Sequence, residues 1–140
     1  MTTATTAATA TTAATRRGVT FLRAAIALQT AAVFFQAVTA GLLLSTSSAE
    51  VVHGVGARVM YGASMLYVLA AVLAWRPGGG SPRPVLHAVG FLVLASAQVV
   101  LGIAHVPSVH VPLGVLIFGL SVAALVRAPA ARVVRRSGAR

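Results

Sequence analysis

The chain has 140 residues, of which 58% are hydrophobic and only 9% are charged. So few polar side chains cannot cover a soluble globule, and this composition predicts an integral membrane protein. The chain contains no cysteine, which excludes disulfides, thiolate metal sites and iron–sulfur clusters. Its formal net charge of +10 arises from eleven arginines and a single acid, Glu50.

Residues 1–17 are rich in threonine and alanine and show no apolar period, which predicts a disordered N-terminal tail. An apolar stretch follows over residues 18–44. This stretch is too long for the apolar region of a cleaved signal peptide. We therefore expect a first, retained membrane span.

Three further apolar stretches predict three more spans, at about residues 51–75, 84–105 and 109–126. A helix rises about 1.5 Å per residue, so about 20 residues cross the hydrocarbon core, and each stretch approaches or exceeds that length. The connections between the stretches are short. The predicted fold class is therefore all-α, an up-down bundle of four transmembrane helices over residues 18–127.

Arginine placement predicts the orientation of this bundle. Ten of the eleven arginines lie at the start of the first stretch, in the middle connection or after the fourth stretch. The positive-inside rule then places both termini, including a basic tail at residues 128–140, in the cytoplasm of a multi-pass protein of a bacterial plasma membrane. Because topology and anionic lipid explain the basic ends, we expect membrane lipids as partners and no nucleic acid. The oligomeric state stays open.

A repeat relates the second and fourth spans. Residues 53–64 and 110–121 each begin with a histidine and carry an aromatic residue, a glycine and a serine at the same spacing. We interpret this pattern as an internal two-fold repeat of helical hairpins. The second and fourth helices of such a bundle run in the same direction and lie diagonally, so His53 and His110 are expected to face each other at one end.

Two imidazoles on opposite helices are the ligand set of a bis-histidine haem. We expect His53 and His110 to hold the iron of a b-type haem (haem b) near the outer face. The neighbouring spans carry glutamines, which can orient imidazoles or haem substituents, and glycines, which let a flat ring approach the backbone. The residues expected to line the haem in this way are Gln36, Gly41, Gln98 and Gly102.

Four other polar residues have less specific interpretations. Glu50 either belongs to a Ser47-x-x-Glu50 capping box or lies beside the haem. Arg58 either extends to the outer headgroups or contacts a glutamine or a haem propionate, although it lies about 140° around the helix from the first histidine. His105 either ends the third helix as a solvated residue or is an alternative iron ligand. His87, on the arginine-rich side, is expected to be structural.

The segment Glu50-Val-Val-His53 resembles the start of the second helix in one four-helix half of haem A synthase. Gln98-Val-Val-Leu-Gly102 and His110-x-x-x-Gly114 resemble that family's third-helix end and fourth-helix start. The resemblance covers roughly residues 33–126 and implies a bundle that binds haem through histidines. Gly54 stands where the family has arginine, and the chain has one bundle instead of two, so methyl oxidation is not implied.

The chain is also similar to small uncharacterised four-helix membrane proteins of actinobacteria. The features in common are Gln36-x-x-x-Ala40-Gly41 in the first span and histidines that open the second and fourth spans.

The leading hypothesis is a haem-binding membrane protein for electron transfer, haem handling or redox sensing, with a membrane redox partner or a quinone. One alternative is a cofactor-free structural or accessory subunit of a membrane complex. A third is a transporter of a metal or small solute, which the lack of any acid at mid-membrane disfavours. The pattern offers no catalytic residues, so binding is favoured over enzymatic activity.

Overall fold

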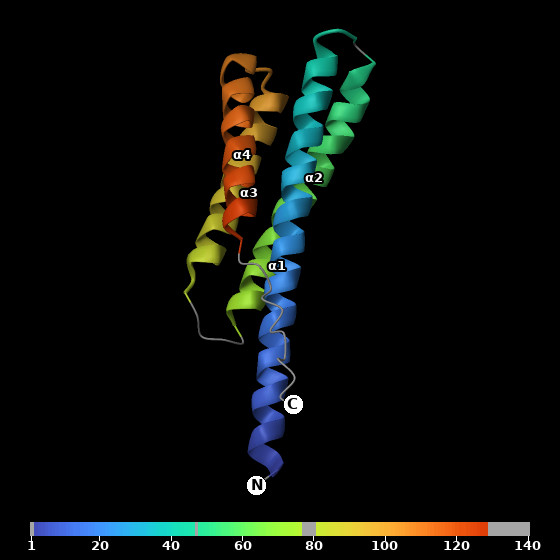
Figure 1. The fold of residues 1–140 in the computed structure, drawn as a ribbon. Coiled ribbons are helices and arrows are strands. Elements are labelled where there is room, and N and C mark those ends of the chain that lie inside the picture. Colours follow the sequence, from blue (N-terminus) through green and yellow to red (C-terminus); the bar gives the residue numbers. More distant parts are fainter. Residues whose placement is uncertain (1, 47, 77–80, 129–140) are drawn as a thin grey trace.

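The computed structural model describes residues 2–46, 48–76 and 81–128, with side chains described from Ala14 onward. These residues form four helices and no strand: α1 (Thr2–Leu43), α2 (Ala49–Trp75), α3 (Arg83–Ile103) and α4 (Pro107–Arg127). All four helices are long and apolar enough to cross a membrane. Consecutive helices run in opposite directions (Figure 1). The predicted all-α, four-helix membrane bundle is confirmed.

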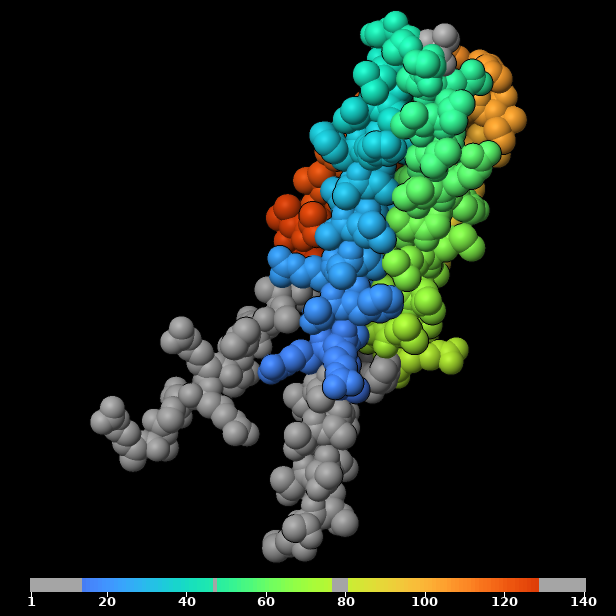
Figure 2. All heavy atoms as spheres, turned by 90° about the vertical axis from the view of Figure 1, so that its right-hand side faces the viewer, coloured from blue at the N-terminus to red at the C-terminus, as the bar shows by residue number. Residues whose placement is uncertain are grey.

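The four helices pack in a ring. α1 and α3 each contact α2 and α4, whereas α2 and α4 lie diagonally opposite each other, as do α1 and α3. Figure 2 shows α1 and α2 side by side along their length. One end of the bundle is formed by the α1–α2 and α3–α4 connections, and we call it the histidine end; the opposite end is the arginine end.

Helix α1 is longer than the sequence predicts. It begins at Thr2 and continues through residues 2–17, for which a disordered tail was expected, and it extends beyond the other helices at the arginine end (Figure 1). Alanine has the highest helix propensity, and neither glycine nor proline interrupts this stretch. The part of α1 that suits a membrane is Ala14–Leu43. The other helices begin and end within two residues of the predicted spans.

Two predictions, one for the start of α2 and one for the end of the chain, concern residues outside those that the structure describes. Ser48 is the N-cap of α2, and its side chain makes no capping hydrogen bond. Ser47, the first residue of the predicted capping box, lies outside the described residues, as does the predicted basic tail after Ala128. Glu50 lies in the first turn of α2, where a carboxylate interacts favourably with the helix dipole.

Helix α3 ends in a Schellman motif, in which two amides bond carbonyls of the last turn. The Val106 N–H donates to the Leu101 carbonyl (3.1 Å), and the His105 N–H donates to the Gly102 carbonyl (3.2 Å). His105 has a φ of 53°, in the left-handed region that glycine usually occupies at this position. Its ring Nδ1 donates to the Ile103 carbonyl (2.9 Å).

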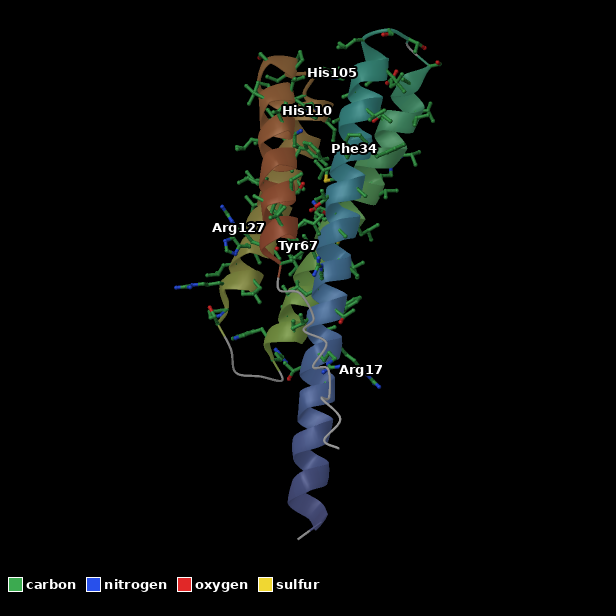
Figure 3. The ribbon with its side chains drawn as sticks, viewed as in Figure 1. Arg17, Phe34, Tyr67, His105, His110 and Arg127 are labelled. Atoms are coloured by element: carbon green, nitrogen blue, oxygen red, sulfur yellow. The ribbon has the colours of Figure 1, made fainter. Side chains whose placement is uncertain are left out.

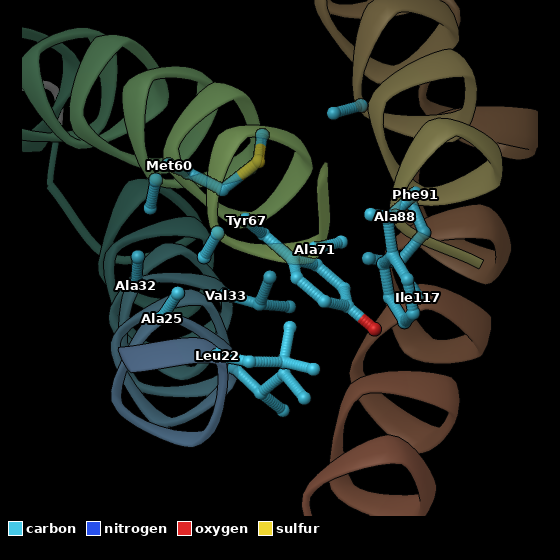
Figure 4. Packing of buried hydrophobic residues seen from close by; sticks show 14 residues of the cluster. Leu22, Ala25, Ala32, Val33, Met60, Tyr67, Ala71, Ala88, Phe91 and Ile117 are labelled. Carbon is cyan, nitrogen blue, oxygen red and sulfur yellow. The ribbon is translucent and has the colours of Figure 1, made fainter. Parts of the chain in front are cut away.

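The apolar core lies in the middle of the bundle and toward the arginine end, and alanines let its helices approach closely. Figure 4 shows the Tyr67 ring extending from α2 toward α3 and α4, where its centroid lies 5.9 Å from that of Phe91. The members of this core cluster are Leu22, Ala25, Ile26, Ala32, Val33, Met60, Ala63, Tyr67, Ala70, Ala71, Ala88, Phe91, Ala95 and Ile117. The cluster stops short of the level of the two histidines that open α2 and α4.

The serines of the sequence repeat are buried in this core. Ser64 Oγ lies 3.1 Å from Gln29 Oε1 and 3.0 Å from the Met60 carbonyl, either of which can accept its hydrogen. Ser121 Oγ donates to a carbonyl of its own helix, and Thr30 Oγ1 lies 3.2 Å from the Ser121 carbonyl. Each repeat therefore places one hydroxyl inside the bundle, on diagonally opposite helices.

Candidate functional site

His53 and His110 lie opposite each other at the histidine end. His53 is the fifth residue of α2 and His110 is the fourth residue of α4, so both are near the start of their helices. Their ring centroids are 6.3 Å apart, and the ring planes are inclined by 66°. Both side chains are half-buried. The diagonal packing of α2 and α4 thus brings together the two histidines that the repeat singles out.

The His110 ring rests on the backbone of α3. Its Nδ1 lies 3.1 Å from the main-chain carbonyl of Gln98. A carbonyl only accepts hydrogen bonds, so Nδ1 carries the proton and Nε2 is left as a bare acceptor. Gly102 lies one turn after Gln98 and next to this ring, since a Cβ there would be in van der Waals contact with it, 3.4 Å from His110 Cε1 and 3.6 Å from Nδ1.

The His53 ring is held by a side chain of α1. Its Nδ1 lies 2.9 Å from Oγ1 of Thr39, whose side chain is buried. The Thr39 hydroxyl lies 3.1 Å from the main-chain carbonyl of Gln36. When the hydroxyl donates its hydrogen to that carbonyl, its lone pairs accept the proton of His53 Nδ1. His53 then has the same tautomer as His110, with the proton on Nδ1 and a bare Nε2.

The Gln36 amide packs against the α2 backbone beside His53. With the amide oriented to match its neighbours, its nitrogen donates to the His53 carbonyl (3.1 Å) and to Thr39 Oγ1 (3.2 Å), and its oxygen accepts the Ala57 N–H (2.9 Å). Gly56 permits this approach, because a Cβ there would lie only 2.5 Å from the Gln36 amide nitrogen in this orientation. Helix α1 therefore holds both the ring and the backbone turn of His53.

Gln98 occupies a related position in the second hairpin. Its Nε2 lies 3.0 Å from the place that a Cβ on Gly114 would take, so the glycine of His110-x-x-x-Gly114 makes room for the amide. Its Oε1 is buried and has no hydrogen-bond partner among the described residues. In both hairpins a glutamine thus packs on a glycine of the helix that carries the histidine.

Four predicted site residues lie apart from this pair. Gly41 is exposed, and a Cβ there would meet nothing within 4 Å. Glu50 and Arg58 are exposed, and Arg58 lies on the side of α2 away from His53. His105 is exposed at the end of α3, with its ring bonded to a carbonyl of its own helix. The structure does not bring these four residues to the histidine pair.

Sequence reasoning missed Thr39 and Gly56. Thr39 follows Gln36 by three residues, so the helical period places it on the same face, and this signal was available. Gly56 was one of several glycines in α2, and spacing alone does not distinguish it from those that face outward. Gly114 was named only as part of the segment that resembles haem A synthase, without a role of its own.

The inward-facing residues change in character toward the histidine end. At the level of the core cluster they are apolar apart from Gln29, Ser64, Thr30 and Ser121, and toward the histidine end they become mainly polar or glycine. The polar members at this level are Gln36, Thr39, His53, Gln98 and His110. Within a membrane, inward-facing polar side chains mark functional sites. In the described part of the chain no group of three or more His, Cys, Asp or Glu side chains could hold a metal ion, and the two imidazoles form a pair.

Comparison with protein-family models, with curated proteins and with solved structures gave no match.

Proposed function

We propose that the protein binds b-type haem between α2 and α4, with His53 and His110 as axial ligands, and that it transfers electrons in the membrane. The spacing of the two imidazoles carries this proposal. Two metal–nitrogen bonds of about 2 Å each account for about 4 Å of the 6.3 Å between the ring centroids, and the two half-rings supply the remainder.

The hydrogen bonds at both Nδ1 atoms support the ligand role. A histidine that binds a metal almost always donates its other ring N–H to a neighbouring acceptor, which orients the ring and selects its tautomer. His110 does so toward the Gln98 carbonyl, and His53 has the Thr39 hydroxyl at the corresponding position. Neither Nε2 bonds to another described residue, so both are available to a metal.

The residues around the pair suit a flat ring with polar substituents. Gly102 lies against the His110 ring, and Gly56 and Gly114 let the two glutamines lie close to the helices. The two hairpins diverge toward the histidine end (Figure 1). An unpaired buried acceptor costs about 1–3 kcal/mol, and a polar group arriving with the ring would satisfy Gln98 Oε1.

Two axial imidazoles favour electron transfer over substrate chemistry, since they leave no open coordination position. We place both termini in the cytoplasm of a bacterial plasma membrane, which puts the histidine end near the outer face. Electrons would then be exchanged with a membrane redox partner or a quinone near that face. The resemblance to one half of haem A synthase is consistent with haem as the cofactor.

The absorption spectrum of the full chain, purified in detergent from haem-supplied cells, tests the proposal. We expect a low-spin b-type spectrum that is lost in His53→Ala and in His110→Ala. His87→Ala is the matched control, because His87 is exposed near the arginine end and should leave the spectrum unchanged. A wild-type protein that stays colourless after reconstitution with haem would contradict the proposal and favour a cofactor-free accessory subunit.

A further inference from the structure

The Nδ1 atoms of the two histidines face different kinds of hydrogen-bond partner. The partner of His110 is a main-chain carbonyl within α3, which only accepts and cannot rotate away. The partner of His53 is a hydroxyl, which turns about a single side-chain bond and accepts the Nδ1 proton when it donates its own hydrogen to the Gln36 carbonyl. An amide carbonyl is also the stronger acceptor, and a stronger bond at Nδ1 makes Nε2 the more basic ligand. His110 is therefore the stronger of the two ligands.

The Thr39 hydroxyl is moreover shared among three partners. It lies 3.1 Å from the Gln36 carbonyl, 3.2 Å from the Gln36 amide nitrogen and 2.9 Å from His53 Nδ1. A hydroxyl has one hydrogen and two lone pairs. The Gln36 amide N–H and the His53 Nδ1–H therefore donate to the same oxygen atom. This competition weakens the hydrogen bond to His53.

Threonine in a helix has a second rotamer available. Its χ1 divides between two states, because Oγ1 can bond the carbonyl three or four residues earlier. Thr39 now bonds the carbonyl three residues earlier, that of Gln36. Rotation to the other state would take the hydroxyl away from His53, whereas no equivalent rotation exists for the Gln98 carbonyl beside His110.

We propose that His110 is the permanent axial ligand, that His53 is the exchangeable one, and that Thr39 controls the exchange; this rests on the proposed haem site. With haem bound, release of His53 would open a coordination position for one small neutral molecule of the carbon monoxide class. The bond to His53 Nε2 would break and one bond to the incoming molecule would form, with no change of redox state. Uncharged side chains surround the pair, since Glu50 and Arg58 are exposed elsewhere, which disfavours a charged ligand.

The first arm of the test uses the haem-free full chain, labelled with ¹⁵N-histidine. We expect the Nδ1–H of His110 to exchange slowly with solvent and that of His53 to exchange faster. Thr39→Val removes the hydroxyl at nearly constant shape and should move His53 toward a mixture of tautomers without changing His110. Equal exchange of the two protons would overturn the proposed inequality, whether or not the protein binds haem.

The second arm measures carbon monoxide binding to the reduced haem protein. Thr39→Val should raise the rate of binding about fivefold, the effect expected from losing one neutral hydrogen bond. Thr30→Val is the matched control, since Thr30 is a threonine of α1 that bonds main-chain carbonyls in the middle of the bundle, away from the histidines. The Thr30→Val variant should bind carbon monoxide at the same rate as the wild type.

The two histidine variants complete the test. His53→Ala should retain haem through His110 and bind carbon monoxide at once, whereas His110→Ala should retain much less haem. Equal haem content in the two variants, or equal rates in Thr39→Val and Thr30→Val, would overturn the inference while the low-spin wild-type spectrum still supports the haem site. A colourless wild-type protein would contradict the haem site itself.

Discussion

Residue type alone does not define the role of a histidine in this chain. His53 and His110 face each other inside the bundle. His87 is exposed near the arginine end of α3. His105 occupies the left-handed position of a Schellman motif, where its ring bonds the end of its own helix. In this position the His105 ring caps the end of α3.

His105→Gly should stabilise the protein. A left-handed conformation costs an ordinary residue about 1–2 kcal/mol and costs glycine almost nothing, so we expect a gain of about 1 kcal/mol in the free energy of unfolding. Thermal unfolding in detergent measures it. His87→Gly, inside α3, should instead lower stability by about 1 kcal/mol. Loss of the low-spin spectrum in His105→Gly would transfer the ligand role to α3 and contradict the His53–His110 pair.

The contact between helices α1 and α2 depends on which glycines face inward. Gly56 faces α1, where the Gln36 amide and the Phe35 ring occupy the space that a Cβ would need. Gly62 lies on the same helix, and a Cβ there would meet nothing within 4 Å. Gly56 and Gly62 are the same residue type in the same helix, and they differ only in which side chains pack against them.

Gly56→Ala should be the more harmful of two otherwise identical substitutions. The new methyl would displace Gln36 from the His53 turn, and overpacking of this kind costs about 1–3 kcal/mol. Gly62→Ala meets no atom, so its stability should equal or slightly exceed that of the wild type. Thermal unfolding and haem content, measured together, distinguish the two variants. Equal stability would show that Gln36 does not pack on Gly56 as described.

The whole molecule places most of its arginines at the end opposite its histidine pair. Figure 3 shows His105 and His110 near one end of the bundle, with Arg17 and Arg127 displaced toward the other. An arginine-rich end retained on the cytoplasmic side would place the histidine pair close to the outer surface. The orientation therefore decides which side of the membrane the histidine pair faces.

Reporter fusions test this orientation. A fluorescent protein fused after Arg140 should be fluorescent and an alkaline phosphatase at the same site inactive, because both report a cytoplasmic C-terminus. Phosphatase inserted into the connection at residues 45–48 should be active. An active phosphatase after Arg140 would reverse the bundle and place the histidine pair at the cytoplasmic face.

The sequence alone was sufficient to predict the four helices and the position of His53 opposite His110. Apolar length is a local property of the chain, and the short connections leave an antiparallel ring in which α2 and α4 are diagonal. The repeat then places the two histidines at the same depth. Residues 2–17 continue the helix of α1, whereas their low complexity predicted a disordered tail.

The surroundings of the histidines required all four helices together. The rotation of each helix about its own axis decides that Thr39 meets His53, that Gly102 lies under His110 and that Gly41 faces outward. Residue spacing within one helix sets only relative angles, and Gln36 and Gln98 do not occupy matching positions of the repeat, since they precede their histidines by 17 and 12 residues. Side-chain packing between neighbouring helices selects one rotation of each, and with it the acceptor that each imidazole reaches.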